Sequence, residues 1–231
     1  MFCACQYGSV DNEKGVKDSD SAVIHIAVLP TEECRPFYVA QQLGLYDSLG
    51  VEVKLDTFMA AMDADTAFMN NKVQLLVSDS LKARYLNSIV KRDSIQSIIT
   101  DTLRLSLMTG KPTRIKAISS LKEKIVAVTR NSALDYFADL TMDKANIKRE
   151  YLNRPQINNI ALRADMLNLN QYDGAILPEP FATQCEEQGA YRINTVNAPL
   201  MRVLVKKSVM KKRKQDIERI KEAYTIAKHA K

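Results

Sequence analysis

Histidine is scarce in this chain of 231 residues, and the common catalytic motifs are missing. The two histidines are His25, in the middle of an expected strand, and His229, near the C-terminal end. The nucleophile elbow, the Walker A loop, the dinucleotide fingerprint and the His-Glu-x-x-His motif do not occur. We therefore predict no catalytic residue and no cofactor. These absences argue against an enzyme, although chemistry carried by carboxylates or lysines stays open.

Cysteine and long apolar runs are also rare. The four cysteines include Cys34 and Cys185, which suit small buried positions, and no zinc-finger or thioredoxin spacing is present. We predict no metal site. No run of 18 apolar residues occurs, so no transmembrane helix is predicted.

The N-terminal segment has an unusual composition. Phe2-Cys3-Ala4-Cys5 resembles the end of a bacterial lipoprotein signal, with a small residue before Cys5 as the lipidated residue. Residues 1–21 would then form a flexible tether between a lipid anchor and the folded domain. The basic and apolar parts of such a signal are missing, so a start codon placed too late and a chance similarity both stay open.

Charge and size narrow the class of protein further. The net charge is +6, and residues 206–214 contain six of the lysines and arginines. A solvated helix start explains this cluster, because no aromatic interleaving supports a nucleic-acid site. No nucleic-acid partner is therefore expected. The length and the 46% hydrophobic content are enough for one large domain or two small lobes.

Apolar runs and amphipathic stretches alternate along the chain, which is typical of an α/β protein. Gly44 should interrupt the first helix, and a second lobe should begin near Gly110. Strands are expected at residues 23–29, 51–55, 73–77, 95–100, 103–108, 125–129, 157–162, 173–177, 191–193 and 201–205. Helices are expected at residues 36–49, 63–70, 81–91, 133–140 and 216–228, with a short one from Ser119.

A double-proline turn follows the apolar strand that ends at Leu177. Pro178 and Pro180 should end the strand and stiffen the turn, with the carboxylate of Glu179 between them. Open α/β sheets place ligand contacts at the carboxyl ends of their strands. Glu179 is therefore a candidate site residue, while a plain strand-to-helix turn is the alternative.

The stretch from Pro36 to Leu55 carries a family pattern. Pro36, Ala40, Gly44-Leu45-Tyr46 and Gly50-Val51-Glu52-Val53 resemble the signature of ABC-transporter solute-binding proteins. The most similar group captures sulfonates, taurine, nitrate and thiamine precursors, and it includes the related pyrimidine-precursor synthases. The resemblance continues through residues 68–83, 120–140 and 157–193.

The resemblance implies a two-lobed α/β fold of the type II periplasmic-binding-protein kind, each lobe a mixed sheet flanked by helices. Lobe I would comprise residues 22–106 and 198–231, and lobe II residues 107–197. Hinges would lie near residues 100–110 and 194–201, with a ligand cleft between the lobes.

The function implied is capture of a small anionic or heterocyclic molecule for an ABC permease, by a monomer in the periplasm or outside the cytoplasmic membrane. An enzyme of the same fold that acts on a small metabolite or cofactor precursor is the alternative. The chain departs from the family at Asn71 and Gln74, where relatives usually carry Gly and Asp, and this leaves the ligand class open.

The candidate ligand-binding residues all lie in loops that should face the cleft. Arg35 is expected to hold an anion through its fork of donors, and the helix starts near Ser80 and Ser132 should offer free N–H groups. A surface charge, ordinary N-capping and core packing are the alternatives for these positions. The candidates are Thr31, Glu32, Arg35, Phe37, Ser78, Asp79, Ser80, Asn131, Ser132 and Glu179.

Overall fold

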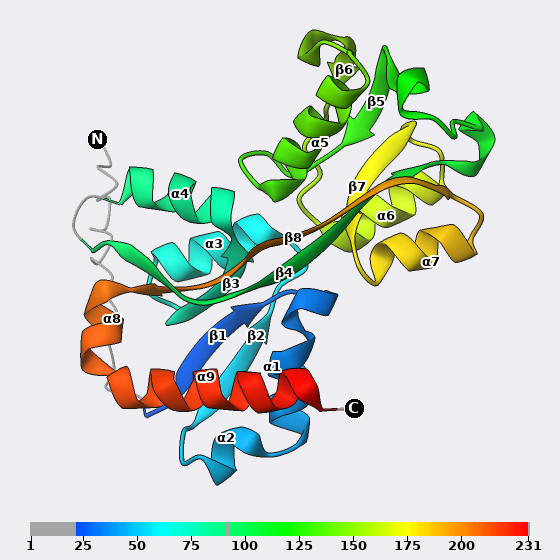
Figure 1. Ribbon diagram of the computed structural model, residues 1–231. Coiled ribbons are helices and arrows are strands. Elements are labelled where there is room, and N and C mark those ends of the chain that lie inside the picture. Colours follow the sequence, from blue (N-terminus) through cyan, green and yellow to red (C-terminus); the bar gives the residue numbers. More distant parts are fainter. Residues whose placement is uncertain (1–21, 91–92, 231) are drawn as a thin grey trace, which may run out of the picture.

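A continuous mixed β-sheet runs through the computed structural model, which describes residues 22–90 and 93–230 (Figure 1). Its eight strands in this part of the chain have the order β2-β1-β3-β8-β4-β7-β5-β6. The predicted tether and Cys5 lie outside the described residues. The strands are β1 (Ile24–Val28), β2 (Val53–Thr57), β3 (Leu75–Asp79), β4 (Ile95–Thr109), β5 (Lys124–Ala127), β6 (Leu152–Asn153), β7 (Gly174–Pro178) and β8 (Tyr191–Lys206).

Two long strands, β4 and β8, join two lobes (Figure 1). In lobe I the strands β2, β1 and β3 are parallel, and β8 pairs antiparallel with β3. In lobe II the strands β6, β5 and β7 are parallel, and β4 pairs antiparallel with β7. Between these regions β4 and β8 pair with each other, so in the described part of the chain the sheet passes from one lobe to the other through two antiparallel strands.

Helices cover both faces of the lobe I sheet because its buried strands are apolar on both sides. Ile24, Ile26 and Val28 of β1 face one core, while Ala27 between them faces another. The first core is covered by α1 (Arg35–Gln42) and α9 (Lys214–His229), with α2 (Leu45–Ser48) beside them. The second core is covered by α3 (Ala61–Met69) and α4 (Ser80–Ile89). The short helix α8 (Lys207–Lys212) leads into α9.

Lobe II repeats this layered arrangement with its own helices. Val126 of β5 faces the core that includes Phe137, while Ala127 faces a second core with Leu167. The helices are α5 (Ala133–Lys144) on the first face, and α6 (Ile160–Asn168) and α7 (Phe181–Glu187) on the second. Short 3-10 turns complete the described chain: η1 (Glu32–Cys34), η2 (Lys111–Thr113), η3 (Ile118–Leu121) and η4 (Arg149–Tyr151).

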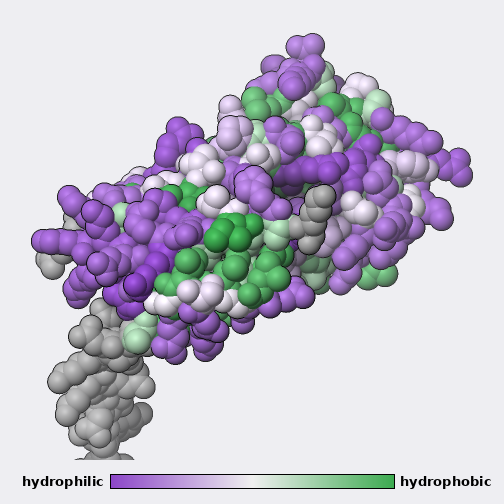
Figure 2. Space-filling model, turned by 60° about the horizontal axis from the view of Figure 1, so that its bottom comes forward, coloured by the Kyte–Doolittle hydropathy of each residue, from purple (hydrophilic) through white to green (hydrophobic). Residues whose placement is uncertain are grey.

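The outer surface is mostly hydrophilic. Figure 2 brings the α2 and α9 side of lobe I forward and shows a hydrophobic patch within a polar surface. Leu43 and Ile226 are among the exposed large apolar side chains of the described residues. Within the described residues, no helix combines the length and the apolar character needed to cross a bilayer.

The predicted α/β alternation is confirmed, and the break at Gly44 is confirmed by its φ of 63° between α1 and α2. The predicted strands 95–100 and 103–108 were wrong as separate elements, because pairing with β8 carries β4 through the polar residues Asp101 and Thr102. The strands predicted at 191–193 and 201–205 are likewise parts of β8.

The predicted strand at residues 157–162 was also wrong, since helix α6 begins at Ile160. Asn159 caps this helix by accepting a hydrogen bond from the N–H of Leu162 at 3.0 Å. Ile160, Ala164 and Leu167 form the buried face of α6. A short apolar run of this kind has no clear periodicity, which is why it resembles a strand in the sequence.

Candidate functional site

The carboxyl ends of strands from both lobes meet around one cavity. β1 and β3 end there from lobe I, and β5 and β7 end there from lobe II. The cavity has a volume of about 60 Å³. Its wall is formed by Leu29, Glu33, Cys34, Ala61, Asp65, Val77, Ser78, Asp79, Lys82, Leu103, Leu105, Thr129, Ser132, Leu134, Ile160, Arg163 and Pro178.

Direct contacts between the lobes surround this cavity. Ala60 of lobe I pairs with Asn159 of lobe II in an isolated antiparallel bridge. Next to it, the N–H of Ile160 donates to the carbonyl oxygen of Met59 at 2.9 Å. Elsewhere the N–H of Glu32 donates to the carbonyl oxygen of Glu179 at 2.9 Å, from η1 to the turn after β7. The structure therefore has its lobes in contact.

Asp79 joins the starts of two helices across the cavity wall. Its Oδ1 accepts hydrogen bonds from the N–H groups of Leu81 and Lys82, both at 2.9 Å, and so caps α4. The N–H of Ala133, at the start of α5 in lobe II, also stabilises this carboxylate. Burial nevertheless raises the pKa of Asp79 above its ordinary value, against these hydrogen bonds. The helix-start N–H groups that we expected to hold a ligand are therefore partly used by Asp79.

Ser132 has the corresponding position in lobe II. Its Oγ accepts a hydrogen bond from the N–H of Leu134 at 3.2 Å and caps α5. Ser132 and Ser78 both line the cavity, whereas Ser80 is the first residue of α4 and is not part of the cavity wall. Asn131 lies in the preceding loop with a φ of 54°, and its side chain is exposed.

Lys82 and Asp65 form a buried ion pair in the cavity wall. Their side chains approach to 3.2 Å between Nζ and Oδ2 and are 8% and 10% exposed. Burial raises the pKa of Asp65, while the neighbouring ammonium opposes that shift. Because each charge faces its opposite, this pair leaves little net charge for a ligand.

Arg163 of α6 differs from these groups because no carboxylate faces it among the described residues. Arg163 is only 1% exposed to solvent. Its Nη1 donates to Thr129 Oγ1 at 2.7 Å and to the carbonyl oxygen of Ile157 at 2.6 Å. Its Nε is the one buried side-chain nitrogen or oxygen in the described part of the chain that has no hydrogen-bond partner. Burial lowers the pKa of Arg163 to about 10, so the guanidinium is still charged at neutral pH.

Glu33 contributes a carboxyl group to the same wall. Burial is the main reason that its pKa is raised to about 7, and the nearby backbone N–H and the side chain of Thr31 oppose that shift. Near neutral pH a large fraction of Glu33 is therefore protonated. This carboxyl group can then donate a hydrogen bond as well as accept one.

Arg35 does not lie in this cavity. It is exposed and lines a second hollow of about 270 Å³, together with Glu32 and Glu33. Arg104 and Lys228 lie in the same hollow, and Lys228 is paired with Asp101 at 2.7 Å. The position of Arg35 is thus not in the wall of the cavity, although Glu33 belongs to the walls of both hollows.

Phe37 and Thr31 have positions inside lobe I. Phe37 is fully buried, and its ring packs against that of Tyr224 with centroids 5.0 Å apart. Thr31 is buried and donates from its hydroxyl to Cys34 Sγ at 3.7 Å. Neither residue lines the cavity or the second hollow.

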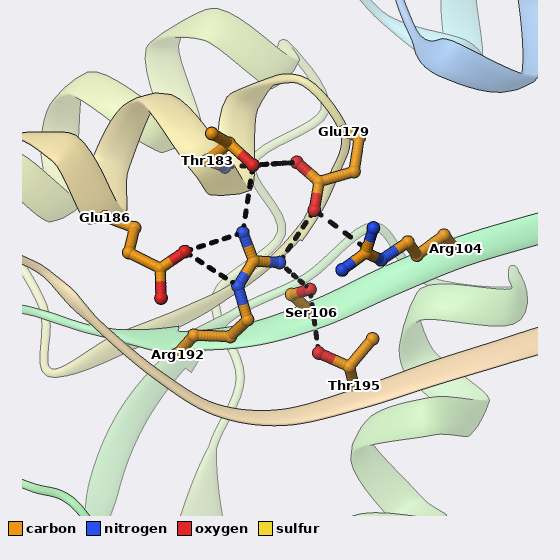
Figure 3. Close-up of polar contacts among 7 residues, drawn as sticks. All are labelled: Arg104, Ser106, Glu179, Thr183, Glu186, Arg192 and Thr195. Atoms are coloured by element: carbon orange, nitrogen blue, oxygen red, sulfur yellow. Dashed lines mark hydrogen bonds and ion pairs between the residues drawn. The ribbon is translucent and has the colours of Figure 1, made fainter.

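Glu179 belongs to a polar network in lobe II (Figure 3). Its Oε1 accepts from Arg192 Nη1 at 2.7 Å, and its Oε2 accepts from the hydroxyl of Thr183 at 2.8 Å. Arg192 also donates to Glu186 and to Ser106. Burial opposes ionisation of Glu179, but these hydrogen bonds outweigh it and hold its pKa below the ordinary value. The carboxylate is engaged within the protein, and it does not line the cavity.

Sequence reasoning missed Arg163, Lys82, Asp65 and Glu33 as cavity residues. The only signal for Arg163 was a single arginine in the mostly apolar residues 160–167, just after the stretch 157–162 that we had assigned to a strand. Among the described residues, no group of three or more His, Cys, Asp or Glu side chains could hold a metal ion.

Comparisons with known proteins give matches in structure and not in sequence. No protein-family model and no curated protein matches the chain. The alkanesulfonate-binding protein SsuA from Xanthomonas axonopodis pv. citri, bound to MOPS, aligns with a TM-score of 0.74 and 12% identity, over 90% of this chain and 74% of that one.

Two further solved structures are similar to the chain. The periplasmic nitrate-binding protein NrtA from Synechocystis PCC 6803 aligns with a TM-score of 0.78 and 11% identity, over 90% of this chain and 61% of that one. A Candida albicans protein described as having the generic periplasmic binding protein fold aligns with a TM-score of 0.72 and 14% identity, over 89% and 70% of the two chains. The chain has the two-lobed α/β fold of the periplasmic binding proteins.

Proposed function

We propose that the chain is the solute-binding component of an ABC importer, and that it captures a small molecule in the cavity between its lobes. The observation that carries this proposal is the cavity itself, whose wall combines strand ends and helix starts from both lobes. A ligand there would contact lobe I and lobe II at once. It would therefore favour the arrangement in which the lobes touch.

The connection between the lobes supports a hinge. Among the described strands, β4 and β8 alone link the two parts of the sheet, and their pairing has irregular register between Asp101 and Leu103. We place the hinge in this region and in the facing part of β8. Opening would separate Ala60 from Asn159 and expose the cavity to solvent.

The structural neighbours support the transport role. Their descriptions name alkanesulfonate-, nitrate- and methylphosphonate-binding proteins and a ligand-binding component of an ABC-type import system. By analogy, the partners of this chain would be a small ligand and ABC permease subunits, and the protein would act as a monomer outside the cytoplasmic membrane. We keep the predicted lobe boundaries and the anchor at Cys5 as parts of this proposal.

A disulfide that holds the two lobes together reversibly would test the proposed solute-binding function. Residues paired in an antiparallel bridge have Cα atoms roughly 4.5–5.5 Å apart, which suits a disulfide. Ala60→Cys with Asn159→Cys should therefore form one on oxidation. Cys3 and Cys5 would be replaced by serine, while Cys34 and Cys185 are free and buried. The matched control is Ala60→Cys alone.

The readout is native mass spectrometry of protein purified without denaturation. The oxidised double variant should retain a bound small molecule through dialysis, while its reduced form and the single variant should release it. Equal release from the locked and unlocked forms, or the absence of added mass in both, would contradict the proposal. A bound molecule whose mass changes during incubation would favour an enzyme instead.

A further inference from the structure

We infer that one end of lobe I lies against a membrane surface that carries anionic phospholipids. The contact would be made by four lysines on helix α8 and at the start of α9, which we call the α8 surface: Lys207, Lys211, Lys212 and Lys214. This inference goes beyond solute binding. Its one link to the proposed function is the lipid anchor at Cys5, which would bring the same end of the domain to a membrane.

The charge of the α8 surface is all of one sign. Residues 207–214 contain five lysines and arginines and no aspartate or glutamate. Arg213 is paired with Asp216 at 2.7 Å. Asp93, beside α8, accepts a hydrogen bond from the N–H of Ser208 at 3.0 Å. The four lysines are exposed, and within the described part of the chain none of them forms an ion pair. A partner with several negative charges would therefore complement this surface.

Helix stability does not account for the positions of these lysines. A helix favours anionic residues in its first turn and cationic residues in its last. Lys211 and Lys212 end α8 and fit this rule. Lys207 is the first residue of α8 and Lys214 is the first residue of α9, where a positive charge is unfavourable. The interpretation of this cluster as a solvated helix start thus leaves two of its lysines unexplained.

Helix α8 directs its lysines away from the protein. Val209 and Met210 pack against the core of lobe I, while Lys207 and Lys211, one turn apart on the helix, are exposed. In Figure 1, α8 lies at an end of lobe I that is remote from lobe II. A flat partner would therefore reach the α8 surface without touching the contacts between the lobes, whether these are closed or open.

The described chain begins beside the α8 surface, and this favours a membrane as the partner. The carbonyl oxygen of Ala22 accepts a hydrogen bond from Arg213, which lies between Lys212 and Lys214 in the sequence. The chain that carries Cys5 therefore joins the folded domain at this end. Residues 6–21 separate Cys5 from Ala22 and span at most about 60 Å when fully extended. A single acyl chain binds a membrane only marginally, whereas a chain combined with a polybasic patch gives stable anchoring.

Sedimentation with phospholipid vesicles tests the α8 surface without the anchor. The full chain with Cys3→Ser and Cys5→Ser has no cysteine that an anchor could use at these positions. Vesicles of phosphatidylcholine, with and without phosphatidylglycerol, differ in their charge. We expect the protein to sediment with the anionic vesicles and to stay in solution with the neutral ones. High salt should release it, because the Debye length falls from about 10 Å at 0.1 M to about 3 Å at 1 M.

Paired variants then assign the binding to α8. A lysine close to an anionic membrane strengthens binding by about fivefold. Lys211→Gln together with Lys212→Gln should therefore weaken binding to the anionic vesicles by roughly ten- to thirtyfold. The matched control is Lys111→Gln together with Lys144→Gln, which removes the same charge from exposed lysines of lobe II. This control should bind the vesicles as the parent protein does.

Several results would overturn the inference. They are the absence of binding to anionic vesicles, equal binding to neutral ones, and unchanged binding after both substitutions in α8. An equal loss in the lobe II control would show that only the net charge of +6 matters. A DNA oligonucleotide that bound more tightly than the anionic vesicles at the same salt concentration would identify a nucleic-acid surface instead. None of these results bears on solute binding, which the mass spectrum of the disulfide-locked variant tests separately.

Discussion

Replacing Asp79 by alanine should destabilise the protein and weaken the contact between its lobes. The carboxylate of Asp79 accepts the N–H groups of Leu81 and Lys82 and thereby caps α4. The same carboxylate also interacts with the N–H of Ala133 in the other lobe. The substitution therefore removes a helix cap and an interlobe hydrogen bond together.

The expected size follows from these two losses. An aspartate cap replaced by alanine costs about 1 kcal/mol, within a range of about 0.5–2 kcal/mol. A buried N–H left without an acceptor, here that of Ala133, costs about 1–3 kcal/mol. The free energy of unfolding should thus fall by roughly 2–4 kcal/mol in Asp79→Ala. Asp79→Asn keeps an acceptor oxygen and removes a buried charge, so its loss should be about 1 kcal/mol or less.

Urea unfolding followed by circular dichroism would measure both variants, with the dependence on urea concentration compared with that of the unmodified chain. Ser80→Ala is a useful control, because its side chain makes no hydrogen bond in the described structure. The reasoning would be refuted if Asp79→Ala were within about 0.5 kcal/mol of the unmodified chain, the range typical of surface substitutions. It would also be refuted if Asp79→Asn lost as much as Asp79→Ala.

Three other predictions concern single groups. The pKa of Glu33 rises from 4.5 to about 7 on folding, so the folded state binds the proton more tightly. The free energy of unfolding should therefore fall as pH rises through that window, by up to about 1.4 kcal/mol per pH unit. Thermal melts of Glu33→Gln should lack this slope, and a slope equal to that of the unmodified chain would argue against this role of Glu33. Arg192→Met should cost up to about 3–5 kcal/mol in urea unfolding, since it leaves the buried carboxylate of Glu179 with only the more distant Arg104, at 3.8 Å, as an ion-pair partner. A loss below about 1 kcal/mol would mean that the Arg192–Glu179 pair behaves as an exposed one. Gly174→Ala should cost about 1–3 kcal/mol, because the new Cβ would lie 2.9 Å from the carbonyl oxygen of Met108; an unchanged melting temperature would show that β4 and β7 can move apart there.

The sequence was informative where local chemistry decides the structure. Asp79 and Ser132 were correctly placed at helix starts, because capping depends on neighbouring residues. Gly44 was correctly placed as a break, because its left-handed conformation favours glycine. The strand ends of both lobes were expected at one cleft, and the structure places them around one cavity.

Features that depend on distant contacts were not predictable in this way. The continuity of β4 and β8 arises from their pairing with each other, over residues far apart in the chain. The burial of Arg163 depends on its contacts with Thr129, 34 residues away in the chain, and with the carbonyl oxygen of Ile157. Arg35 was predicted to face the cleft; it lines the second hollow, which shares Glu33 with the cavity wall, and its role there stays a prediction.

Movement of the lobes is the central claim, and small-angle X-ray scattering of the Ala60→Cys, Asn159→Cys variant tests it most directly. The protein would be freed of bound molecules by unfolding and dialysis, refolded, and measured in its oxidised and reduced forms. The oxidised form should give the profile calculated from the structure with its lobes in contact, and the reduced form should give a larger radius of gyration. Identical profiles from the two forms would contradict the account, because the lobes would then stay together without a ligand or a lock.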